Sequence, residues 1–220
     1  MLRSALKAAA GLSTMPPAFV YFDLGNVLAL FDRERSIRQV AAVSGADERA
    51  VAAVVLDAAM QRNLESGQID WNRFHAEFVR RTGTDVAAGT LAAAASDMFR
   101  LNVPILPVVA ALRRMGIPLG ILSNTCEPHW RHLEASGYAV LSRSFREVVL
   151  SHEVLAVKPD RGIYEIAAAR AGVAADRIFF CDDLPAHVEA ARAAGWDAEV
   201  FVSAPALAEQ LARRGLNVGL

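Results

Sequence analysis

Cysteine is scarce in this chain of 220 residues, which contains only Cys126 and Cys181. Their wide separation excludes both a Cys-x-x-Cys metal or redox site and a disulfide framework. Because free thiols are typical of reducing compartments, we expect a cytoplasmic location.

An excess of one charge and long hydrophobic runs are also missing. Lys and Arg number 23 against 24 for Asp and Glu, which leaves no positive surface for a phosphate backbone, so we expect no nucleic-acid partner. No apolar run approaches the ~20 residues that span a bilayer, so we expect no membrane partner. With 54% hydrophobic residues, the chain can bury the core of a globular protein.

Acidic residues are absent from residues 1–17, which contain Arg3, Lys7 and several Ala and Ser residues before the Pro16-Pro17 break. Such a composition fits either a targeting peptide or a loosely ordered extension. Since no clear cleavage site follows, we predict that residues 1–17 are an N-terminal extension.

The pattern after this segment indicates an α/β protein. An apolar run at 18–22 predicts a strand buried on both faces. From Pro104 onward helical and strand patterns alternate, and this rhythm predicts a Rossmann-like, doubly wound parallel sheet. Further strands are predicted at 118–122, 145–150, 177–181 and 198–202.

Residues 32–100 interrupt this rhythm, because they show helical periodicity and no strand pattern. We predict that 18–31 and 101–220 form the core and that 32–100 form an inserted helical cap over the sheet. The predicted helices of this insertion cover 35–43, 48–61, 71–81 and 87–99.

Polar residues follow the predicted strands, where ligands bind in open parallel sheets. These residues are Asp23, Ser123, Asn124, Lys158, Asp182 and Asp183. Gathered carboxylates repel one another, and a hard cation such as Mg²⁺ with oxygen ligands relieves that repulsion. A carboxylate leaving a buried strand can act as nucleophile, and a lysine can neutralise a transferring phosphoryl group. The set predicts phosphoryl transfer through an aspartyl-phosphate.

The same segments resemble the four motifs of the haloacid dehalogenase superfamily, in the branch with a helical cap. The resemblance spans roughly residues 19–202 and depends on the order of the motifs. They are Phe22-Asp23-Leu24-Gly25-Asn26-Val27-Leu28, Leu122-Ser123-Asn124-Thr125, Val157-Lys158-Pro159 and Phe180-Cys181-Asp182-Asp183.

The resemblance implies a role for each residue of the site. Asp23 is implied to be the nucleophile and a Mg²⁺ ligand, and Lys158 to pair with Asp23 and the phosphate. Ser123 and Asn124 are implied to bind the transferred phosphoryl group. Of the acidic pair, Asp183 is implied to bind the metal directly and Asp182 directly or through water. The expected partner is a small-molecule phosphate ester, and the chain is expected to be a monomer or homodimer.

Gly25 departs from the pattern of this family. Two residues after the nucleophile, most phosphatases of the family have a second aspartate that protonates the leaving oxygen. The Gly25 backbone carbonyl can still bind the metal but no side chain can donate a proton, and such catalysis contributes ~10²–10⁴-fold. Asp32, Glu34, a water or a substrate group could substitute.

The residues therefore predict a Mg²⁺-dependent phosphatase acting on a small phosphorylated metabolite. The Asp-Leu-Gly-Asn-Val form also resembles a subgroup that includes sugar-1-phosphate phosphatases, so a sugar phosphate is one candidate. Two alternatives stay open. Gly25 is compatible with a weak or inactive protein that binds a phosphorylated ligand. A 2-haloacid dehalogenase, which needs no metal, would leave the Asp182-Asp183 pair unexplained.

Overall fold

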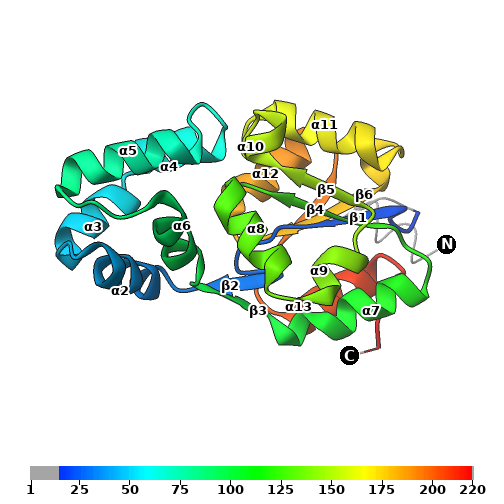
Figure 1. Ribbon diagram of the computed structural model, residues 1–220. Helices are drawn as coiled ribbons and strands as arrows, with labels where there is room; N and C mark the ends of the chain where they lie inside the picture. The colour runs from blue at the N-terminus through cyan, green and yellow to red at the C-terminus, as the bar shows by residue number, and fades with distance from the viewer. Residues whose placement is uncertain (1–14, 220) are drawn as a thin grey trace.

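A five-stranded parallel sheet forms the centre of the protein, whose computed structural model describes residues 15–219. The strand order is β5-β4-β1-β6-β7, so β1 lies between β4 and β6 (Figure 1). Because these three strands are parallel, their carboxyl ends lie on the same side of the sheet. This confirms the predicted doubly wound α/β core. The strands are β1 (Phe19–Phe22), β4 (Leu119–Ser123), β5 (Glu147–Leu150), β6 (Ile178–Asp182) and β7 (Asp197–Val200).

Both faces of the sheet are covered, which explains why β1 is apolar throughout. Alternate side chains of a strand point to opposite faces. Val20 and Phe22 pack in one hydrophobic cluster, and Phe19 and Tyr21 pack in another. The first cluster includes residues of η1 (Val103–Ile105), α7 (Leu106–Arg114), α8 (Glu127–Ala135), α9 (Ala139–Arg143) and α13 (Ala204–Arg213). The second involves α10 (Ser151–Val154), α11 (Arg161–Ala171), η2 (Ala175–Arg177) and α12 (Pro185–Ala193).

Five helices lie together beside the sheet (Figure 1) and share a third hydrophobic cluster that includes Phe74, Phe78 and Leu91. They are α2 (Arg33–Ser44), α3 (Glu48–Val55), α4 (Ala58–Glu65), α5 (Trp71–Thr82) and α6 (Ala88–Ser96). Each of α2 to α5 begins after an aspartate whose side chain accepts a backbone hydrogen bond, as helix N-caps do. These caps are Asp32, Asp47, Asp57 and Asp70.

Two sequence predictions for this region were wrong. The single helix expected at 48–61 is split, because the Asp57 side chain accepts hydrogen bonds from Ala59 and Met60 and starts α4. The helix expected at 87–99 ends at Ser96, and a strand, β3 (Phe99–Leu101), follows it. It pairs antiparallel with β2 (Ala29–Phe31) where the chain enters and leaves the helical region. Three residues are too few for a recognisable alternation.

The position of Lys158 also differs from the prediction, because α10 separates it from β5. The extension predicted over 1–17 lies outside the described residues, apart from its last three. The boundaries predicted for the core and the cap stay predictions. None of the helices within residues 15–219 is long and apolar enough to span a membrane.

Substitution by alanine is expected to change the stability in opposite directions at two glycines, one in the packed central sheet and one on an open side of a helix. Gly120 of β4 lies beside Tyr21, and a Cβ added to Gly120 would collide with the Tyr21 ring. We expect Gly120→Ala to lower the free energy of unfolding by about 1–3 kcal/mol. Gly89 of α6 has no atom within 4 Å of such a Cβ, so Gly89→Ala should raise it by up to about 1 kcal/mol. Urea unfolding monitored by circular dichroism measures both, and equal effects would contradict the packing argument.

Candidate active site

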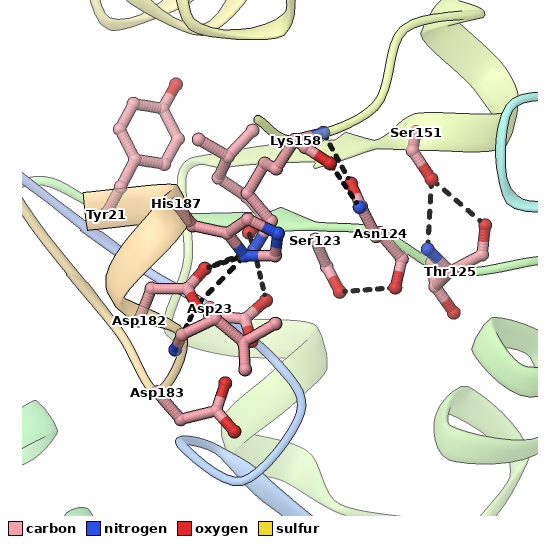
Figure 2. A network of polar contacts seen from close by, with 12 residues as sticks. Tyr21, Asp23, Ser123, Asn124, Thr125, Ser151, Lys158, Asp182, Asp183 and His187 are labelled. Carbon is pink, nitrogen blue, oxygen red and sulfur yellow. Dashed lines mark hydrogen bonds and ion pairs between the residues drawn. The ribbon is translucent and has the colours of Figure 1, made fainter. Parts of the chain in front are cut away.

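Three carboxylates meet at the edge of the sheet where β1, β4 and β6 end. Asp23 follows β1 directly, Asp182 ends β6 and Asp183 comes next. One oxygen atom of each lies within 4.8 Å of the others, and Figure 2 shows Asp23 and Asp182 beside Lys158 and His187, with Asp183 next to the two acids. A donor set made only of oxygens fits a hard cation such as Mg²⁺.

The amine of Lys158 lies between two of these acids. Lys158 Nζ is 2.7 Å from Asp23 Oδ1 and 2.6 Å from Asp182 Oδ2, and it also donates to the backbone oxygen of Leu122 at 3.0 Å. The lysine is only 2% exposed. A buried ammonium with three acceptors is fully satisfied, so its charge is fixed at the floor of the site.

Asn124 holds the backbone of Lys158 in place. The Asn124 side-chain amide donates to the Lys158 carbonyl at 2.9 Å, and its oxygen accepts from the Lys158 N–H at 2.8 Å. The peptide bond between Lys158 and Pro159 is cis. Ser123, at the end of β4, is 2% exposed, and its hydroxyl donates to the Asn124 carbonyl at 3.3 Å. The side-chain amide of Asn124 thus positions the backbone of Lys158, a role that its place in the sequence did not indicate.

Asp182 is surrounded by hydrogen-bond donors. Besides Lys158, the backbone N–H of Leu184 donates to Asp182 Oδ1 at 2.9 Å, and His187 Nδ1 lies 3.0 Å from both carboxylate oxygens. His187 belongs to α12, five residues further along the chain, and the sequence prediction missed it. The only available signal was a helical residue one turn beyond the acidic pair.

Asp183 is half-buried and more accessible than Asp182. Its Oδ2 accepts a hydrogen bond from the side-chain amide of Asn26 at 2.9 Å. Asn26 has a φ of 55°, a left-handed conformation that asparagine adopts more readily than most residues. Asn26 belongs to the first motif, but nothing in the sequence indicated that it orients Asp183.

The pKa values of these groups follow from burial and from the shared lysine. Burial raises the pKa of Asp23 above its ordinary value, with the charge of Asp182 adding to the effect and Lys158 opposing it. Burial acts on Asp182 in the same direction, but Lys158 and His187 outweigh it and lower the pKa of that carboxyl. Burial also works against the charge of Lys158, which the two aspartates restore by raising the pKa of its ammonium. These shifts favour the charged forms of the Asp182 carboxylate and the Lys158 ammonium.

A cavity of about 1200 Å³ opens above the cluster. Core residues Asp23, Lys158 and Asp183 line its floor, and residues of the neighbouring helices, among them Trp71 and Phe74, line its other walls. This volume is ample for a small metabolite.

The space beside Gly25, two residues after Asp23, is filled by the ring of Phe31. A Cβ at Gly25 would lie 3.1 Å from Cε1 of Phe31, so an aspartate there would displace the ring. Of the two acids that the sequence offered as substitutes, Asp32 caps α2 by accepting from the Arg35 N–H at 2.9 Å. The side chain of Glu34 is 87% exposed and lies 3.7 Å from Arg38. Both line the cavity, but no hydrogen bond or ion pair within the described residues holds either of them toward Asp23.

Neither cysteine can serve as a nucleophile. Both are free and buried, and burial raises the pKa of the Cys126 thiol to about 12. Thiols act as nucleophiles in their ionised form, so a thiol nucleophile is disfavoured in this cavity.

Solved structures resemble this fold closely. A HAD family enzyme from Bacteroides thetaiotaomicron, in complex with magnesium and inorganic phosphate, superposes with a TM-score of 0.74 at 23% identity, covering 84% of this chain and 94% of the other. A predicted HAD-like family hydrolase from Porphyromonas gingivalis gives 0.73 at 26% identity, with coverages of 88% and 97%. A mutant of CbbY from Rhodobacter sphaeroides, in complex with xylulose-1,5-bisphosphate, gives 0.57 at 20% identity, with coverages of 84% and 85%.

The family model described as haloacid dehalogenase-like hydrolase matches residues 18–195. No curated protein matches the sequence. The matched range includes all four motifs, from the strand before Asp23 to the helix after Asp183. The chain therefore belongs to the haloacid dehalogenase-like hydrolases.

Proposed function

We propose that this protein is a Mg²⁺-dependent phosphatase that hydrolyses a small phosphorylated metabolite through a phosphorylated Asp23. The observation that carries the proposal is the buried Lys158 amine, bonded to Asp23 and Asp182 beneath a large cavity. A fixed cation beside a carboxylate nucleophile suits phosphoryl transfer, in which charge stabilisation provides most of the catalysis.

Asp23 is the nucleophile in this proposal. Its carboxylate attacks phosphorus while the bond to the leaving oxygen breaks on the opposite side, and water later releases phosphate from Asp23. Lys158 neutralises the transferring oxygens, and the Ser123 hydroxyl and the Asn124 backbone donate to them. Because the Asn124 amide is bonded to Lys158, its side chain acts by holding that amine in place.

The donor set at the floor suits magnesium. Asp23, Asp183 and the Gly25 carbonyl would hold the ion, and Asp182 would act directly or through water. Bound Mg²⁺ would neutralise phosphate charge beside Asp23. The magnesium and phosphate bound by the enzyme from Bacteroides thetaiotaomicron support this assignment.

We also propose that residues 32–100 form a cap that selects the substrate, because helices of this region line the cavity. The phosphosugar bound to CbbY supports a sugar phosphate as candidate substrate, and the sugar-1-phosphate subgroup stays a prediction. So do a cytoplasmic location and a monomeric or homodimeric state.

Replacement of the nucleophile tests the activity. We expect Asp23→Asn to lower kcat on 4-nitrophenyl phosphate by ~10³-fold or more, because the amide cannot displace the leaving group. EDTA should have a comparable effect on the unchanged protein. Asp176→Asn, in η2 at the protein surface, is the matched control and should retain full activity.

Three outcomes would contradict this proposal. Asp23→Asn could retain activity within tenfold, EDTA could leave turnover unchanged, or phosphate esters could stabilise the protein thermally without any turnover. The last result would instead favour a ligand-binding protein. Halide release from a 2-haloacid without Mg²⁺ would indicate a dehalogenase.

The charge balance of the floor predicts a large effect of Lys158→Met on stability. Two buried carboxylates would lose their shared cation, so we expect the free energy of unfolding in EDTA to fall by about 3–5 kcal/mol. Saturating Mg²⁺ should recover about 2–3 kcal/mol by binding the folded acids. Arg161→Met removes an exposed ion pair with Glu165 and should change the stability by less than about 1 kcal/mol. Equal urea midpoints for the two variants would refute the argument.

A further inference from the structure

The proposed reaction needs a proton donor for the leaving oxygen, and the first motif of the site does not provide one. Gly25 has no side chain, and the Phe31 ring occupies the space beside it. The Asp32 carboxylate is bonded to the start of α2, and Glu34 extends into solvent. A donor from another segment that lines the cavity is therefore needed.

Glu65 is placed to fill this role. It is the last residue of α4, it is half-buried, and it lines the same cavity as Asp23 and Lys158. Within residues 15–219, no side chain or backbone group forms a hydrogen bond or ion pair with its carboxylate. A partly buried acid without a partner in a protein cavity is unusual, because burial of an unpaired carboxylate is costly.

Two contacts hold α4 against the core on either side of Glu65. On one side, Arg62 Nη2 lies 3.0 Å from Asp160 Oδ2, two residues after Lys158. On the other, Gly67 has a φ of +70°, and a Cβ there would lie 2.7 Å from the His152 oxygen of α10. Only a residue without a side chain allows this turn to approach α10 so closely. The C-terminal end of α4, which includes Glu65, thus lies against the core on both sides of this residue.

The surroundings of Glu65 favour its protonated form. Burial is the largest influence and raises the pKa of Glu65 above its ordinary value, although electrostatic interactions with four basic side chains oppose this shift. Those groups are Lys158 from the core loop, Arg33 from α2, His187 from α12 and Arg62 from α4. A glutamic acid with a raised pKa stays protonated closer to neutral pH, as a general acid requires.

The geometry of an in-line displacement also favours a proton donor on α4. In an in-line displacement the leaving oxygen lies opposite the nucleophile. Asp23 is at the floor, so the leaving oxygen faces the helices above it. A donor on α4 therefore lies on the side where the alcohol departs.

We propose that Glu65 is the general acid of this phosphatase and takes the place of the aspartate that Gly25 replaces. As the bond between Asp23 and phosphorus forms and the bond to the leaving oxygen breaks, the Glu65 carboxylic acid transfers its proton to that oxygen and releases an alcohol. The Glu65 carboxylate then accepts a proton from the water that attacks the phosphorylated Asp23, which releases phosphate and restores both side chains. This inference rests on the proposed phosphatase activity.

A series of substituted aryl phosphates, from phenyl phosphate to 4-nitrophenyl phosphate, tests the assignment with Mg²⁺ present. These esters differ little in shape but greatly in how much their leaving oxygen needs a proton. We expect Glu65→Gln to lower kcat/KM by ~10²-fold for phenyl phosphate and by less than about fivefold for 4-nitrophenyl phosphate. Glu65→Asp should recover part of the loss on phenyl phosphate. Glu48→Gln, a cap residue outside the cavity, should follow the unchanged protein across the series.

The outcomes separate this inference from the proposed function. Absence of Mg²⁺-dependent turnover by the unchanged protein on every ester would refute the phosphatase activity and, with it, the role of Glu65. If the unchanged protein is active, an equal loss across the series would make Glu65 a binding or structural residue. No loss, or a leaving-group-dependent loss in Asp32→Asn or Glu34→Gln instead, would also overturn the assignment. A melting temperature for Glu65→Gln near that of the unchanged protein verifies folding.

Discussion

The buried ammonium of Lys158 is the interaction on which the whole site depends. Asp23 follows β1 and Asp182 ends the neighbouring β6, so the register of these two strands brings two buried carboxylates together. Without a cation between them, their repulsion and desolvation would oppose the packing of the central sheet. The lysine relieves both, and Asn124 fixes its backbone through two hydrogen bonds. In the proposed reaction, the same Lys158 ammonium that stabilises the packing of the two acids also interacts with the phosphoryl group.

The floor and the wall of the cavity serve different purposes. Charged side chains from the carboxyl ends of the strands form the floor, and in the proposed reaction they contact the phosphoryl group that all phosphate esters share. The helices of the wall contribute the Trp71 and Phe74 rings and the acid Glu65, which has no hydrogen-bond or ion-pair partner among residues 15–219. Because Arg62 and Gly67 attach α4 to the core, this wall is positioned by contacts that lie outside the motifs. In the proposed mechanism, substrate selection and proton transfer can therefore change without disturbance of the charged floor.

Much of this arrangement could be predicted from the sequence, because it depends on local pattern. A run buried on both faces identified β1, and the alternation of helices and strands identified the parallel sheet. The short pair β2 and β3 was missed because three-residue strands have no measurable period. The break between α3 and α4 was missed because Asp57 acts as a cap through its side chain, whereas the surrounding alanines and valines continue the helical pattern.

The sequence by itself determined which chemical groups follow the strands and that Gly25 has no proton to give, since both are properties of residues and their order. Only the tertiary structure decided which groups meet. It placed His187 against Asp182 and Asn26 against Asp183, and it turned Glu65 toward the cavity instead of solvent. The physical reason is that periodicity shows which residues share a face of a helix, whereas the environment of that face is set by distant segments that pack against it.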